Sequence, residues 1–108
     1  MYREYSRKTL MLLFIMEKFL NIPVTDEQKQ ILSILDVKLV EQASTTTVSL
    51  SYGSGKVATI TYTTALSAGV ETYRDEVQNA IVSALATGWT TVAVEYIPID
   101  AVTGISIA

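Results

Sequence analysis

The chain has 108 residues, of which 49% are hydrophobic, a formal net charge of −3, and neither histidine nor cysteine. The acidic balance argues against nucleic acid as a partner, and the lack of cysteine excludes disulfides, thiolate metal sites and cysteine nucleophiles. A domain of this size buries only about two-thirds of the surface that its unfolded chain exposes, so part of the apolar content is expected to face another molecule.

The first predicted element is a helix over residues 2–20, a stretch without Gly or Pro that is rich in good helix formers. Its middle, residues 9–16, reads TLMLLFIM and leaves no polar stripe. A helix that is apolar all round needs cover all round. In so small a chain, this predicts an interface on at least one side of the helix.

Two other interpretations of this apolar segment are a membrane span and a signal peptide. Eight residues are far fewer than the roughly 20 that span a bilayer. A signal peptide would need a small-residue cleavage pattern, which is missing after the segment. A helix lying on a membrane surface stays open as the alternative, and it would make the protein a membrane-surface or secreted binding module.

A second helix is expected over residues 26–42, after the break at Pro23. Thr25 and Gln28 match the capping-box pattern, with Thr25 as the N-cap. An apolar face follows at helical spacing, formed by Ile31, Leu32, Ile34, Leu35, Leu39 and Val40.

At residue 43 the composition changes to Thr, Val, Ile and Tyr, which are typical of strands. A hairpin that pairs Leu50 with Ala58 keeps the apolar residues of both strands on one face, whereas a slip by one residue would mix the faces. This register places Tyr52 opposite Lys56 and implies a three-residue loop. Gly55 suits the left-handed position of such a loop.

The clearest helix is expected over residues 70–86. Its charged residues, among them Arg74 and Asp75, fall opposite the apolar side, and Gly88 is placed to end it. Ser67 is the predicted N-cap. The expected buried positions are Val70, Tyr73, Val77, Ala80, Ile81, Ala84 and Leu85.

Strand-like sequence returns at residues 89–99 and, after a turn, at Ile105 and Ile107, which predicts a C-terminal hairpin. The expected fold class is therefore α+β, in the order α-α-β-β-α-β-β. We expect one structural domain overall, with an N-terminal helical arm of two helices over residues 1–44 and a small α+β body over residues 45–108.

Two motifs that could carry chemistry have simpler explanations. Residues 53–56, Gly-Ser-Gly-Lys, suggest a phosphate-binding loop, but Val57 stands where that loop needs Ser or Thr. Glu71, Asp75 and Glu76 lie opposite the apolar side of their helix, which indicates a solvated face. We therefore expect no catalytic residues, no metal ligands and no cofactor.

Residues 48–99 resemble a module that recurs in bacteriophage structural proteins. There a Thr-rich hairpin leads through a small-residue loop into an Ala-rich helix and then back to strands. The matching stretches are VATITYTTALSAGVETYRDEVQNAIVSALATG and TTVAVEYIPI. The loop reads SAGVET where the module usually has a Gly-Asp pair, and the two N-terminal helices have no counterpart. The resemblance implies an architectural role in a capsid, neck or tail, without catalytic residues.

We therefore expect a non-enzymatic structural subunit of a virion, assembled in the host cytoplasm. The expected partners are copies of itself and other virion structural proteins, and not nucleic acid, a membrane or a small molecule. The apolar first helix should form the contacts, with tyrosines on its basic start as further anchors. The predicted interface residues are Tyr2, Tyr5, Leu12, Leu13, Phe14, Met16 and Phe19.

Overall fold

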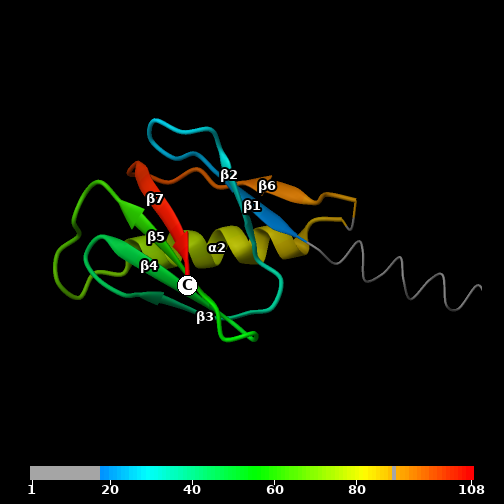
Figure 1. The fold of residues 1–108 in the computed structure, drawn as a ribbon, viewed down its shortest axis with the longest axis horizontal. Helices are drawn as coiled ribbons and strands as arrows, with labels where there is room; N and C mark the ends of the chain where they lie inside the picture. Colours follow the sequence, from blue (N-terminus) through cyan, green and yellow to red (C-terminus); the bar gives the residue numbers. More distant parts are fainter. Residues whose placement is uncertain (1–17, 89) are drawn as a thin grey trace, which may run out of the picture.

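The computed structural model describes residues 18–88 and 90–108, which form seven strands and one helix (Figure 1). One sheet has three strands in the order β2-β1-β6, and the other has four strands in the order β3-β4-β5-β7. Neighbouring strands are antiparallel except β1 and β6, which are parallel. The elements are β1 (Phe19–Ile22), β2 (Gln30–Ser33), β3 (Val37–Gln42), β4 (Thr47–Tyr52), β5 (Val57–Tyr62), α2 (Thr72–Ala86), β6 (Ala93–Glu95) and β7 (Val102–Ile107).

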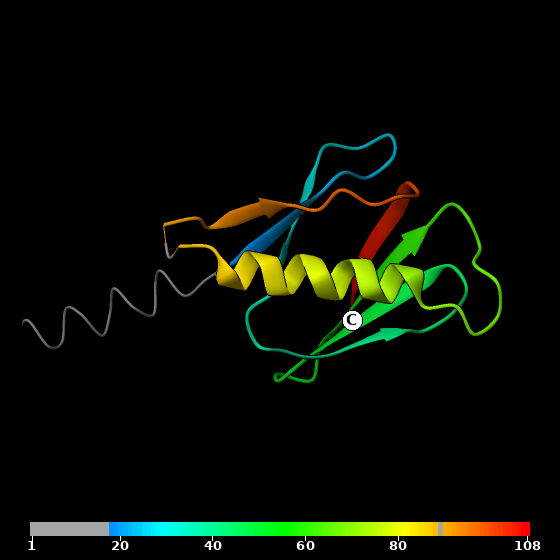
Figure 2. The same ribbon diagram turned by 180° about the vertical axis from the view of Figure 1, so that it is seen from behind.

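The two sheets meet just beyond the end of β1. Val24 forms an isolated parallel bridge with Val102, and the N–H of Thr25 donates to the carbonyl of Val102 at 2.9 Å. Helix α2 lies along one side of both sheets and contacts β1, β3 and β4 (Figure 2). The helix and the strands share one core, made of Leu20, Ile22, Val24, Leu32, Ile34, Val48, Leu50, Ala58, Ile60, Tyr62, Tyr73, Val77, Ile81, Ala84, Tyr96 and Val102.

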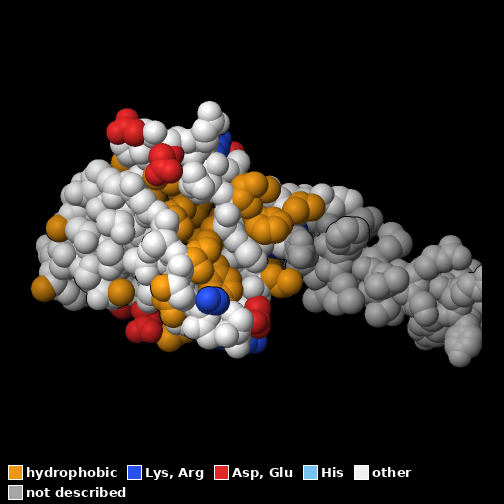
Figure 3. Space-filling view, in the orientation of Figure 1, with side chains coloured by type: hydrophobic (Ala, Val, Ile, Leu, Met, Phe, Trp, Pro, Cys, Tyr) orange, Lys and Arg blue, Asp and Glu red, His pale blue; other side chains and the backbone are white. Residues whose placement is uncertain are grey.

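Hydrophobic side chains also reach the surface. In Figure 3 they form a strip through the middle of one face and a second group over β1 and β6. Lys and Arg side chains are sparse on this face. The body therefore does not enclose all of the apolar content that the composition provides.

The β4–β5 hairpin has the predicted register. Leu50 pairs with Ala58, and the N–H of Tyr52 donates to the carbonyl of Lys56 at 2.9 Å. Gly55 has a φ of 92°, which is the left-handed conformation expected of it. Buried and half-buried residues alternate along both strands, as a sheet with one face on the core requires.

The helix predicted over residues 26–42 is wrong, because this part of the chain forms β2 and β3. Leu32 and Ile34 are buried, whereas Ile31 is 64% exposed, so the core side alternates as in a strand. Asp36 has a φ of 67°, which a right-handed helix cannot accommodate. The spacing of the apolar residues fits both a helix and a strand. The strand forms because β1 and β4 supply backbone hydrogen-bond partners for β2 and β3.

The two ends of the chain also differ from the expected order. Phe19 and Leu20, predicted as the end of the first helix, lie in β1, and residues 1–17 lie outside the described residues. The predicted C-terminal hairpin is wrong, since β6 pairs with β1 while β7 pairs with β5 in the other sheet. The described fold is mostly β, in the order β-β-β-β-β-α-β-β, which replaces the predicted α-α-β-β-α-β-β.

Helix α2 agrees with the prediction over most of its length, beginning two residues later than expected. Val70 and Leu85 differ from the expected buried side, because they are 39% and 53% exposed. The positions that are buried as predicted are Tyr73, Val77, Ile81 and Ala84.

Lys18, the residue before β1, holds the C-terminal end of α2. Its side chain is only 5% exposed. The ammonium donates to Thr87 Oγ1 at 2.7 Å, to the Gly88 carbonyl at 2.9 Å and to the Thr91 carbonyl at 2.5 Å. These contacts use all three of its hydrogens. Its positive charge also interacts favourably with the partial negative charge at the end of the helix. The last turn of the helix has no basic residue of its own.

Replacing this lysine should destabilise the fold. Lys18→Met keeps the aliphatic part but removes three hydrogen bonds and the charge, so the free energy of unfolding should fall by about 2 kcal/mol. Urea unfolding followed by circular dichroism measures the change. Lys38→Met is the control, because the Lys38–Asp36 ion pair is exposed and should contribute about 0.5 kcal/mol or less. Equal losses in both variants would contradict the capping role.

Candidate functional site

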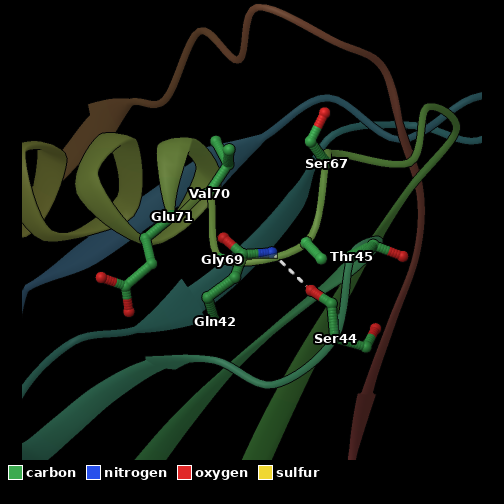
Figure 4. Close-up of a pocket in the computed structure, with 8 residues that line it drawn as sticks. Gln42, Ser44, Thr45, Ser67, Gly69, Val70 and Glu71 are labelled. Atoms are coloured by element: carbon green, nitrogen blue, oxygen red, sulfur yellow. Dashed lines mark hydrogen bonds between the residues drawn. The ribbon is translucent and has the colours of Figure 1, made fainter.

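A pocket of about 370 Å³ lies at the N-terminal end of α2 (Figure 4). The end of β3 and the residues after it form one wall, and the loop that leads into α2 forms the other. The pocket is lined by Gln42, Ser44, Thr45, Ser67, Ala68, Gly69, Val70 and Glu71.

Gln42, the last residue of β3, connects the two walls. Its Oε1 accepts a hydrogen bond from the backbone N–H of Arg74, in the first turn of α2, at 3.0 Å. Its Nε2 donates to the carbonyl of Ser44 at 2.7 Å, the contact dashed in Figure 4. Glu71 occupies the N-cap position without a side-chain cap bond. Gln42 therefore caps α2, and the predicted cap, Ser67, lines the pocket instead.

The Gln42 amide should contribute measurably to stability. Gln42→Ala leaves the Arg74 N–H without its partner, and the free energy of unfolding should fall by about 1 kcal/mol. Gln30→Ala is the control, because Gln30 is an exposed strand residue whose side chain donates only to the nearby Gln28 carbonyl at 3.4 Å. Chemical denaturation of both variants tests the difference, and a Gln42→Ala loss no larger than that of the control would contradict the capping role.

The chemistry of this pocket is modest. Glu71 is its one titratable lining residue. The Glu71 carboxylate is 54% exposed and lies 3.3 Å from Nη2 of Arg74, which also lies 3.0 Å from Asp75. Glu71 and Asp75 thus lie on a solvated face, as predicted. The Glu71 carboxylate bonds to Arg74 and not to a lining hydroxyl, so the geometry suits the attachment of the helix.

A second polar cluster lies inside the core. The rings of Tyr62 and Tyr73 stack with centroids 3.8 Å apart and an interplanar angle of 4°. The Tyr62 hydroxyl lies 2.7 Å from that of Tyr96, which donates to Glu76 Oε1 at 3.0 Å. Because Tyr96 gives its hydrogen to the carboxylate, Tyr62 is the donor to Tyr96. β5, α2 and the segment after β6 are thereby joined.

The other side of the cluster is closed by Tyr73. Its hydroxyl lies 2.6 Å from both the Thr64 carbonyl and Asp100 Oδ2. Burial, together with the hydrogen bond to Asp100, raises the pKa of Tyr73 to about 12. Burial likewise raises the pKa of Tyr62 and of Tyr96. The three phenols are therefore neutral hydrogen-bond donors at neutral pH.

The sequence predicted part of this cluster. Tyr73 was expected in the core from the apolar side of its helix, and it is buried, as are Tyr62 and Tyr96. Glu76 was expected on the solvated face, but it reaches Tyr96 and accepts the N–H of Ile99 at 3.4 Å. The available signal was helical spacing, because Glu76 lies between Tyr73 and Ala80 at intervals of three and four residues, on the border of the buried side.

The tyrosine cluster predicts a specific alkaline transition. The folded-state pKa values exceed the unfolded value of about 10, so the stabilisation is complete below that pH and is lost as the pH rises toward 12 and beyond. Urea unfolding at a series of pH values should show a steep fall in stability above about pH 10. Absorbance at 295 nm should report ionisation of these tyrosines only together with loss of the circular dichroism signal. Their ionisation near pH 10 in a folded protein would contradict the cluster.

Of the predicted interface residues, the structure describes Phe19 alone. Tyr2, Tyr5, Leu12, Leu13, Phe14 and Met16 lie outside the described residues. Phe19 lies in β1, the central strand of its sheet, where it pairs with Ser33 on one side and Ala93 on the other. It is half-buried, so it belongs to the body and not to a separate arm.

The described surface adds exposed apolar residues that are not among the predicted interface residues. Ile97 and Ile99, in the connection from β6 to β7, are 84% and 74% exposed. Leu39, Val82 and Leu85 border a groove between β3 and α2 and are 50%, 61% and 53% exposed. Apolar patches of this kind mark contact surfaces when they are contiguous.

Within residues 18–88 and 90–108, no helix is long and apolar enough to cross a membrane. The same residues contain no group of three or more potential metal ligands placed to hold an ion. Comparison of the chain with protein-family models, with curated proteins and with solved structures finds no match.

Proposed function

We propose that this protein is a non-enzymatic structural subunit of a larger assembly and that it acts through protein–protein packing. The observation that carries the proposal is the amount of apolar surface outside the core. The body exposes Leu39, Val82 and Leu85 by half of their area or more, and the sequence carries a further apolar run at residues 10–16. Association would bury both sets of side chains.

The polar groups of the body support the same function. Glu76, Tyr62 and Tyr96 bond to one another inside the core, and Gln42 and Lys18 are occupied at the ends of α2. These side chains fix the positions of the helix and the strands, as is expected of a rigid structural subunit. A bacteriophage virion is the setting we propose, on the sequence resemblance of residues 48–99 alone.

Phe14 provides the direct test of assembly. The wild-type chain should form a defined multimer, or grow with concentration, in size-exclusion chromatography with light scattering. Phe14→Ala should raise the dissociation constant by about 100-fold or more, since loss of a buried aromatic side chain costs about 3–5 kcal/mol. Val92→Ala, at a position 46% exposed on the body, is the control and should assemble normally.

Two results would contradict this proposal. One is a wild-type chain that stays monomeric at every concentration, both alone and with co-expressed virion proteins. The other is a Phe14→Ala variant with unchanged oligomeric state and unchanged incorporation into particles. Liposome flotation that depends on residues 10–16 would instead favour the membrane-surface alternative.

A further inference from the structure

An apolar groove between β3 and α2 adjoins the point at which residues 1–17 join the body. The groove has a volume of about 320 Å³. Ile34, which lines it, donates its backbone N–H to the Lys18 carbonyl at 3.0 Å, and Lys18 also holds the end of α2. The apolar lining consists mainly of Ile34, Leu39, Val40, Ile81, Val82 and Leu85.

We propose that this groove receives residues 2–16 of a second copy of the chain. The inference rests on the proposed assembly function and names the surface that the N-terminal segment contacts. The segment is apolar at every position from 10 to 16. The groove offers three partly exposed apolar side chains, Leu39, Val82 and Leu85, that the body leaves uncovered.

The length of the segment fits the groove. As the helix that its sequence predicts, residues 5–16 would extend over about 17 Å, and the α2 residues that line the groove, from Arg74 to Leu85, also extend over about 17 Å. A segment lying parallel to α2 would place residues 10–16 beside Val82 and Leu85. Its first residues would then lie at the start of α2.

The charges agree with this parallel orientation. The start of the segment carries Arg3, Arg7 and Lys8. The start of α2 carries Glu71 and Asp75, which are 54% and 60% exposed and share a single arginine, Arg74. Exposed Glu41 of β3 lies at the same end of the groove, since Gln42 next to it bonds to Arg74. Lys38, which also lines the groove, is paired with Asp36.

The position of Lys18 favours a second copy as the source of the segment. β1 starts at the C-terminal end of α2 and runs back along it (Figure 2). For the segment to fold onto its own groove, the chain would have to reverse between Met16 and Lys18. Connections between helices and strands usually take 2–6 residues, whereas Glu17 is the one residue between Met16 and Lys18. A hinge this short favours exchange between copies.

Disulfide trapping tests the contact, because the chain has no cysteine of its own. Full-length Met16→Cys and Leu85→Cys proteins are mixed and oxidised, and the products are separated on a non-reducing gel. We expect a cross-linked heterodimer, at least about five-fold more abundant than in a mixture of Met16→Cys with Ile99→Cys, because a disulfide needs close Cα atoms. Circular dichroism verifies that each variant is folded.

A second measurement separates the groove from the assembly itself. Leu85→Arg should raise the dissociation constant by about tenfold or more, whereas Ile99→Arg, at the other exposed patch, should not. If Leu85→Arg assembles as tightly as wild type and the Met16–Leu85 cross-link does not form, the groove is not the binding site. The proposed assembly function would then be unaffected. A monomeric wild type would overturn both. A double variant, Met16→Cys with Leu85→Cys in one chain, tests the alternative. If its disulfide forms only within a monomer, the segment comes from the same chain and not from a second copy.

Discussion

Helix α2 is held at both ends by side chains that belong to the strands, and the arrangement of the two sheets depends on these attachments. Lys18 precedes β1 of the three-stranded sheet and bonds at the C-terminal end of the helix, 69 residues away at Thr87. Gln42 ends β3 of the four-stranded sheet and caps the first turn, 32 residues away at Arg74. Because α2 has neither a side-chain N-cap nor a basic last turn of its own, these two contacts tie each end of the helix to a different sheet.

The tyrosine cluster joins the same parts of the molecule from inside. Tyr62 comes from β5, Tyr73 from α2, and Tyr96 from the segment that follows β6. Burying three hydroxyls is unfavourable unless each finds a partner, and here each does. The parallel rings of Tyr62 and Tyr73 add a direct contact between β5 and α2. A network of this kind has few alternative arrangements, so it specifies how the helix and the two sheets fit together.

The elements that were predicted well are those whose information is local. The β4–β5 hairpin follows from a period of two residues and from the conformation of Gly55, and α2 follows from a single helical face. Residues 26–42 could not be decided in this way, because their apolar residues fit the helical and the strand period alike, and only the pairing with β1 and β4 decides between them. Asp26 and Asp36, both at positive φ, were a usable signal, since Asp adopts the left-handed conformation more readily than most residues.

The site was harder to predict than the fold, for a related reason. A tyrosine on an apolar face predicts burial, and burial was found. The carboxylates that satisfy these hydroxyls, Glu76 and Asp100, come from other elements, and nothing in the local pattern links them to the tyrosines. The strand predicted up to Ile99 was expected to end or to lie at an edge at Pro98, which cannot donate to a ladder, and β6 ends at Glu95, before the exposed pair Ile97 and Ile99.

Strand β3 presents two different surfaces, and the difference selects the kind of segment that can bind there. It is an edge strand, and its exposed Lys38 and Glu41 carry charges of the type that protect edges from the addition of another strand. A register shift between Val37 and Leu39 further disturbs the regular edge. The groove toward α2 stays apolar. Docking through side chains is therefore favoured over backbone pairing, which suits an incoming helix better than an incoming strand.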